Sequence, residues 1–141
     1  MTVFSGTYRH SVDSKKRLFI PAKFREILGD EFMVTKNIDG CLDIITAEAR
    51  DAIAEKLSIL PKTQTAKIKR FLFSGAGDCT PDSQGRIILP QQLLEYASIE
   101  KDVLIVGASD HIEIWNEELY EKNIVGESID DLADQMNDIG W

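Results

Sequence analysis

The amino-acid sequence predicts an α+β fold that is mainly β with short helices, built from two tandem β-α-β-β(-α) repeats packed about a pseudo-twofold axis. Two observations carry this prediction. The segment Asp13 to Pro21, DSKKRLFIP, recurs at Asp82 to Pro90, DSQGRIILP, with Asp, Ser, Arg and Pro at a constant offset of 69. At an offset of 70, the segment CLDIIT (41–46) then aligns with HIEIWN (111–116). Such repetition indicates one supersecondary unit written twice.

The first copy has a readable order of elements. Strand-favouring residues and polar turn residues alternate, and Pro21 and Gly29 stand where a short helix would begin and end. Thr46 can cap a second helix, which Pro61 would stop. We therefore expect strands over 6–10, 17–20, 32–36 and 41–45, and helices over 22–28 and 47–60.

The second copy repeats this order, and the two copies are joined by a basic segment. We expect a turn over 82–85, strands over 86–89, 103–106 and 112–115, a helix over 90–97, and a further helix capped by Asn116. Residues 63–73 read as an amphipathic helix. The predicted organisation is a first repeat at 1–60, a basic linker helix at 61–75, a second repeat at 76–125 and an acidic tail at 126–141, either helical or disordered.

Each repeat is too small to bury both faces of a sheet by itself. The three short strands of each β-α-β-β unit cannot bury both faces of a sheet, so the two copies are expected to share one core. With 141 residues and 43% apolar content, the chain can bury such a core without disulfides. Cys41 and Cys79 are therefore expected to be reduced core residues. No apolar run suits a bilayer and no leader is evident, so we expect a soluble, cytoplasmic protein.

The charge of the chain is unevenly distributed. The formal net charge is −8, which alone disfavours a nucleic-acid partner. Residues 1–25 nevertheless have a local balance of +5, whereas residues 102–141 have a balance of −10. Residues 61–75 contain four cations and no acid. A polyanion would be attracted to one part of the surface and repelled from another. A further hypothesis is that cations around Lys67 to Arg70 meet the acidic tail of a neighbouring subunit.

The two Asp-x-x-x-Arg motifs are the candidate functional elements. Asp82 and Arg86, like Asp13 and Arg17, could simply lock a turn through an ion pair. The second turn, Gln84 and Gly85, has no further cation. The first turn, in contrast, contains Lys15 and Lys16 and is expected to be flanked by Arg9 and Arg25, so it has surplus cations that can bond guanine or hold phosphates. The predicted DNA-binding residues are Lys15, Lys16, Arg17, Arg9 and Arg25.

An enzyme or a metal protein is disfavoured by the spacing of reactive residues. Ser5, His10 and Asp13 are triad residue types, but no nucleophile elbow surrounds them. Cys41, Cys79, His10 and His111 are metal-ligand types, but no Cys-x-x-Cys or His-x-x-x-His spacing exists. We therefore expect no catalysis, no metal, no cofactor and no small-molecule substrate, and His111 is expected to be structural.

The paired motifs resemble those of the MraZ proteins, which belong to the AbrB/SpoVT swapped-hairpin superfold. The resemblance runs from FSGT at 4–7 through both Asp-x-x-x-Arg copies to HIEIW at 111–115. It implies a DNA-binding regulator, usually a repressor, of the division and cell-wall gene cluster. The partners implied are repeated promoter boxes in double-stranded DNA and a ring-shaped homo-oligomer, which would associate with the nucleoid. The alternative is an antitoxin-like or other protein-interaction module of the same superfold.

The resemblance places the DNA-contacting loop on Lys15 and Arg17, with Asp13 orienting Arg17. Lys16 stands where Gly is frequent in the family, at a position where Gly tolerates a positive φ. Ser5 stands where many members carry Arg, so a phosphate contact is expected to have moved to Lys16 or Arg9.

Overall fold

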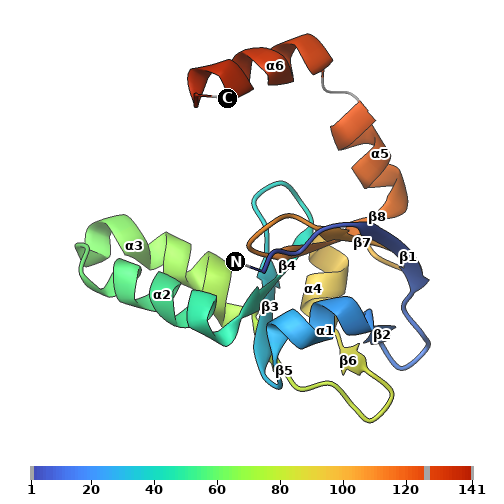
Figure 1. The fold of residues 1–141 in the computed structure, drawn as a ribbon. Coiled ribbons are helices and arrows are strands. Elements are labelled where there is room, and N and C mark those ends of the chain that lie inside the picture. Colours follow the sequence, from blue (N-terminus) through green and yellow to red (C-terminus); the bar gives the residue numbers. More distant parts are fainter. Residues whose placement is uncertain (1, 126–127, 141) are drawn as a thin grey trace.

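The computed structural model describes residues 2–125 and 128–140, and it confirms the predicted fold class: α+β, with short helices around antiparallel sheets (Figure 1). The first copy contains β1 (Thr7–Ser11), β2 (Arg17–Phe19), α1 (Ala22–Leu28), β3 (Phe32–Lys36), β4 (Leu42–Thr46) and α2 (Ala47–Ser58). The linker forms α3 (Lys62–Lys69) and a π-helical turn, η1 (Arg70–Ser74). The second copy contains β5 (Gly77–Cys79), β6 (Arg86–Ile88), α4 (Gln91–Tyr96), β7 (Asp102–Gly107), β8 (Ile112–Asn116) and α5 (Glu117–Val125), followed by α6 (Ile129–Asp138).

The two copies exchange strands. The large sheet has the order β1-β7-β8-β4-β3-β5, and β2 pairs with β6 in a separate small sheet. The first strand of each copy therefore pairs with the other copy: β1 with β7, and β5 with β3. The strand order reads the same from either end when the copies are exchanged, which is the signature of a pseudo-twofold axis. Residues of 1–60 and 76–125 thus interleave in one body instead of forming two adjacent domains.

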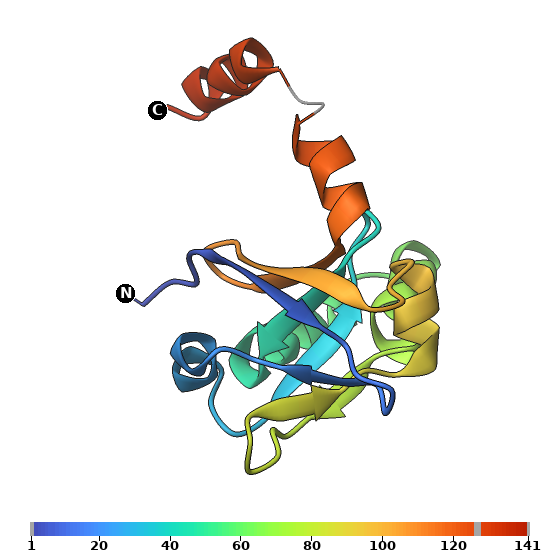
Figure 2. The same cartoon turned by 90° about the vertical axis from the view of Figure 1, so that its right-hand side faces the viewer.

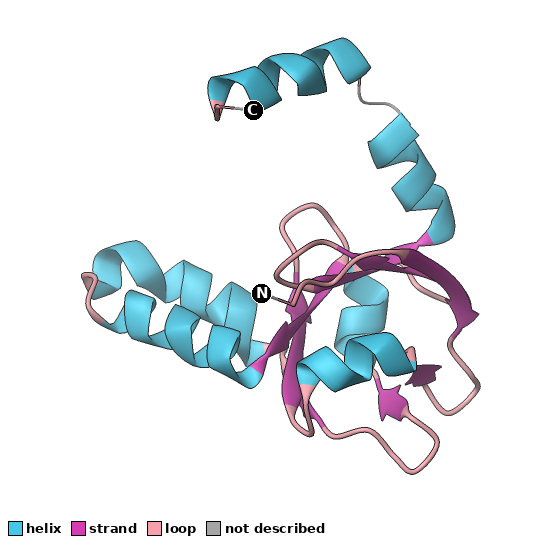
Figure 3. Ribbon diagram, in the orientation of Figure 1, coloured by secondary structure: helices cyan, strands magenta, loops and turns pink. Residues whose placement is uncertain are grey.

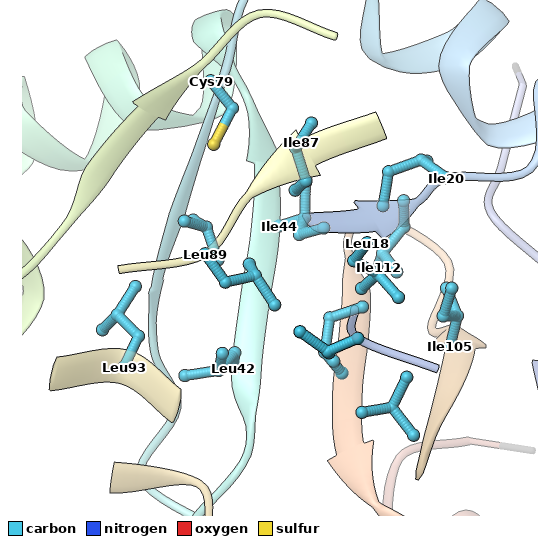
Figure 4. Close-up of a cluster of buried hydrophobic side chains, with 14 of the residues drawn as sticks. Leu18, Ile20, Leu42, Ile44, Cys79, Ile87, Leu89, Leu93, Ile105 and Ile112 are labelled. Atoms are coloured by element: carbon cyan, nitrogen blue, oxygen red, sulfur yellow. The ribbon is translucent and has the colours of Figure 1, made fainter. Parts of the chain in front are cut away.

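A single core holds the small sheet against the large one. Leu18 of β2 and Ile87 of β6 are register partners, and both point toward Ile44 and Ile112 of the large sheet (Figure 4). Apolar residues of α1 and α4 complete the same cluster. The first and third apolar residues after each motif Arg are buried and anchor the two turns to this shared core: Leu18 and Ile20 in the first copy, Ile87 and Leu89 in the second.

Helix ends follow the capping residues. The Thr46 hydroxyl accepts a hydrogen bond from the Ala49 N–H at 3.1 Å, and Asn116 Oδ1 accepts one from the Glu118 N–H at 2.8 Å. Ser128 caps α6, so the tail is helical over the described residues; residues 126 and 127 of the predicted tail lie outside them. No helix in the part of the chain that the structure describes is long and apolar enough to cross a membrane.

The linker helix differs from the prediction in its last turn. A single helix over 63–73 was expected, but the regular helix ends at Lys69 and a wider π-turn follows. In that turn the Leu72 carbonyl accepts a hydrogen bond from the Thr35 hydroxyl, a contact with the sheet that local sequence does not reveal. Together, α2 and α3 form an arm that projects from the body (Figures 1 and 3). Cys41 and Cys79 are free and buried, as predicted.

Candidate nucleic-acid interface

Asp13 organises the turn between β1 and β2. Its Oδ1 accepts hydrogen bonds from the backbone N–H groups of Lys15 and Arg17, each at 2.9 Å, and its Oδ2 accepts one from Arg17 Nε at 2.7 Å. The Arg17 N–H is the largest of the effects that lower the pKa of Asp13 below its ordinary value. Of the side-chain nitrogens of Arg17, only Nε has a hydrogen-bond partner among the described residues. The two terminal nitrogens can therefore bond another acceptor.

The second turn has the same construction. Asp82 Oδ1 accepts from the N–H groups of Gln84 and Arg86 at 2.9 Å, and Asp82 Oδ2 accepts from Arg86 Nε at 3.0 Å. The Arg86 N–H again does most to lower the pKa of the carboxyl. Side-chain exposure is also alike, 29% for Arg17 and 27% for Arg86. The turn-locking role of Asp-x-x-x-Arg is therefore shared by both copies.

The two turns lie together because β2 pairs with β6. The Ile20 N–H donates to the Gly85 carbonyl at 2.9 Å, and the Leu89 N–H donates to the Lys16 carbonyl at 2.8 Å. Both loops project from the same side of the body, at the lower right of Figure 3. Arg17 and Arg86 line one hollow of about 240 Å³. The candidate surface thus combines one turn from each copy.

The placement of Arg25 corrects the expectation that it flanks the first turn. Its Nε donates to the Ile20 carbonyl at 2.9 Å, and its guanidinium lies 5.5 Å from the centre of the Phe19 ring. A Cβ added to Gly85 would come within 2.7 Å of Arg25 Cζ, so this cation lies against the second turn. Because β2 and β6 pair across the axis, the residues just after β2 reach the other copy's turn.

Arg9 is likewise not a free neighbour of the first turn. It lies on β1, and its Nη2 is 2.7 Å from Glu117 Oε1 at the start of α5. The surplus charge of the first turn therefore comes from Lys15 and Lys16, both exposed. Neither has a carboxylate within 4 Å among the described residues. These two lysines are what distinguish the first turn from the second.

Lys16 adopts the backbone conformation that the resemblance suggested for a Gly. Its φ is +63°, and that of the equivalent Gly85 is +79°. The turn therefore keeps its shape with a lysine at this position, at some cost in backbone strain. In return, the turn presents two adjacent cations instead of one.

The three candidate triad residues contact other groups and not one another. Asp13 bonds its own turn, as described. The His10 ring lies 5.3 Å from the Phe19 ring centre, and Ser5 Oγ accepts a hydrogen bond from Lys23 Nζ at 3.2 Å. The arrangement has none of the mutual hydrogen bonds of a nucleophile, base and orienting acid.

A partly buried charge network at the β4–β8 junction was missed by the sequence reasoning. His111 Nδ1 lies 2.7 Å from Asp110 Oδ1, and His111 Nε2 lies 3.0 Å from Glu113 Oε2 and 3.6 Å from Asp43 Oδ1. The Glu113 bond contributes most to raising the pKa of His111, to about 9. His111 is thus structural, as expected, and it is protonated near neutral pH.

The same junction gathers possible metal donors. Ligand atoms of Cys41, Asp43 and Glu113 lie within 4.8 Å of one another. Spacing rules could not find this set because its members come from two strands that are paired in space, with Asp43 opposite Glu113. The only sequence signal was the offset of 70, which superposes Cys41 on His111 and Asp43 on Glu113.

The fold and paired turns define a class: a duplicated, strand-exchanged β-α-β-β protein with one Asp-x-x-x-Arg turn per copy. Comparison of the sequence with models of known protein families identifies the family of this chain. The model of the family described as "MraZ protein, putative antitoxin-like" matches residues 3–70 and again 72–136. The chain belongs to the MraZ family, and the two matches correspond to its two copies.

Relatives cover nearly the full length of the chain. A protein of Heliobacterium modesticaldum is 44% identical over 140 residues, 96% of this chain and 98% of its own. One from Clostridium acetobutylicum is 43% identical over 141 residues, 98% of this chain and 99% of its own. One from Lachnoclostridium phytofermentans is 40% identical over 139 residues, 98% of each. All three are named "Transcriptional regulator MraZ".

Proposed function

We propose that this protein is a transcription regulator that binds double-stranded promoter DNA through the first turn. The observation that carries the proposal is the side-by-side pair of turns in which only the first adds two unpaired lysines, Lys15 and Lys16, to its ion-paired Arg. The names of the relatives support the regulatory class. The function is binding and requires no catalytic step.

The roles of the side chains follow from their chemistry. Arg17 is held by Asp13 through Nε, so its terminal nitrogens present a fork that suits the O6 and N7 acceptors of guanine. Lys15 and Lys16 are exposed point charges that suit phosphate oxygens and set the register of the turn on the duplex. Arg25 of α1 packs against Gly85 and so adds a cation beside the second turn.

One pair of turns is a small contact, and the acidic remainder of the chain opposes DNA. Specific recognition therefore calls for several copies bound to repeated boxes, because linked binding events multiply weak affinities. A ring-shaped homo-oligomer meets this requirement. As the family resemblance implies, the target is the promoter of the division and cell-wall gene cluster, with repression as the outcome and the nucleoid as the location.

The test is a fluorescence-anisotropy titration with DNA from upstream of the gene and with a shuffled duplex of equal length. We expect tighter binding to the upstream DNA and a linear fall of log affinity with log salt. The Lys15→Ala variant should bind both duplexes more weakly and, by the counterion-release rule, reduce the salt slope by about 0.9 per turn engaged. Gln84→Ala, at the equivalent position of the second turn, is the control and should leave the slope unchanged. Equal binding of both duplexes by the parent protein would contradict the proposal.

A further inference from the structure

Helix α6 has an apolar face that the described residues of its own chain do not bury. Ile129, Leu132, Met136 and Ile139 recur at helical spacing, and the two isoleucines are 77% and 81% exposed. None of its residues is buried. A helix of 10 residues is too short to persist alone in water, so its stability calls for packing on that face.

The body carries an apolar groove that is also open. It lies between the β3–β4 turn and the α3–η1 segment and has a volume of about 490 Å³. Ile38, Ile68, Phe71 and Leu72 line it, with Ile38 87% and Ile68 46% exposed. Exposed clusters of this kind mark interaction surfaces.

The charges around the groove and on the helix are complementary. Lys36 and Lys67 lie at the groove, and residues 61–75, which include Lys67, contain no acid. Residues 128–140 contain four Asp and no cation. The one acid at the groove, Asp43, is already engaged by Asn37 Nδ2 at 2.9 Å and by His111. An acidic amphipathic helix is therefore the occupant that this groove fits.

We propose that α6 of one copy docks its apolar face into this groove of a second copy, with its aspartates facing Lys36 and Lys67. A second copy is favoured because α6 lies apart from α3 and the β3–β4 turn of its own chain (Figures 1 and 2), the elements that line the groove. The contact joins two different surfaces, so each subunit can both donate a helix and receive one. Such heterologous contacts propagate into rings or open chains.

This inference deepens the oligomer part of the proposed function and stands apart from DNA recognition by the turns. Its test is the mass of the full chain in solution, measured by light scattering over a range of concentrations. We expect the parent protein to be an oligomer and Met136→Asp and Ile68→Asp each to have the mass of one chain. Matched controls are Asn137→Asp, on the polar side of α6, and Ile59→Asp, an exposed isoleucine outside the groove; both should keep the parent mass.

Mixing the two disrupted variants gives the decisive result. The Ile68→Asp chain retains an intact α6 and the Met136→Asp chain retains an intact groove, so an equimolar mixture should form a one-to-one pair. Misfolded chains could not complement each other in this way. A monomeric parent protein, which would fit docking within one chain or onto another protein, would overturn the proposal. So would parent-like mass for both disrupted variants, or a mixture that stays monomeric. Loss of DNA specificity with assembly intact would instead count against the proposed function alone.

Discussion

Lys16 and Gly85 occupy equivalent positions in the two turns and share a left-handed backbone, with φ of +63° and +79°. For a lysine this conformation costs roughly 1 kcal/mol relative to glycine. Lys16→Gly should therefore raise the free energy of unfolding by about that amount while weakening DNA binding through the lost cation.

The matched control is Lys15→Gly, which removes an equal charge from a position without positive φ. It should weaken binding similarly but not stabilise the fold, since glycine there only adds freedom to the unfolded chain. Urea denaturation and salt-dependent DNA titration separate the two effects. If Lys16→Gly were as destabilising as Lys15→Gly, the strain at Lys16 would be absent in solution.

Gly85 also keeps space for Arg25. A Cβ at Gly85 would lie 2.7 Å from Arg25 Cζ, so Gly85→Ala should displace the guanidinium as well as strain the backbone. Gly40→Ala is the control, because Gly40 has φ of +92° but no neighbour within 4 Å of an added Cβ. We expect Gly85→Ala to lower the melting temperature more than Gly40→Ala, and the excess to vanish in an Arg25→Ala background. Equal losses in both glycine variants would show that Arg25 does not pack on the second turn.

Arg17 and Arg86 make the same contacts, so their removal should cost similar stability. Their effects on DNA should differ, because Lys15 and Lys16 surround only Arg17. We expect Arg17→Ala to abolish specific binding, since one good base contact is worth about 1–3 kcal/mol and is used at every turn engaged. Arg86→Ala should lower the melting temperature or disturb assembly before it affects recognition. The measurements are operator affinity, mass in solution and melting temperature for both variants. If the folded Arg17→Ala protein bound the operator as tightly as the parent protein, the first turn would not be part of the DNA-binding surface.

Local order was readable from the sequence, while pairing between the copies was not. Periodicity and capping located the strands and helices because Pro21, Thr46 and Asn116 act on their immediate neighbours. The exchange of β1 and β5 depends on long-range packing, which leaves no local signal. Arg25 was consequently assigned to the wrong turn, since a residue just after β2 contacts Gly85 only when β2 pairs with β6.

The His111 network shows the same limit. Asp43 and Glu113 are 70 residues apart in the chain and become neighbours only through the β4–β8 register. Charge patterning, in contrast, located the two exposed lysines of the first turn, Lys15 and Lys16, because their place in the turn is a local property of the sequence. Whether these lysines bind DNA stays a prediction.

The junction around Cys41 should hold no stoichiometric zinc. A thiol must lose its proton to bind zinc. Burial raises the pKa of the Cys41 thiol above its ordinary range, and the two carboxylates of the set are already engaged by protonated His111, so a metal would have to displace the thiol proton and compete with the imidazolium. Elemental analysis of protein purified without chelator checks this. Zinc at one per chain that disappears in Cys41→Ser would refute it.

Protonated His111 should make the stability of the fold depend on pH. Its pKa is about 9 in the folded protein, against roughly 6.5 in an unfolded chain. Because the folded state binds this proton more tightly, the stabilisation is complete below pH 6.5 and is lost as the pH rises through 9. His111→Gln removes the charge, so the gap in unfolding free energy between parent and variant should be wide near pH 6.5 and narrow toward pH 9. Groups remote from His111, such as the amino terminus, cancel in this difference. Asp43 does not cancel, because it faces His111 and burial raises its pKa to about 6, so the comparison is read above pH 6.5. A gap that stayed constant from pH 6.5 to about 9 would mean that His111 is neutral in the folded protein, and that the carboxylates around it are balanced in another way.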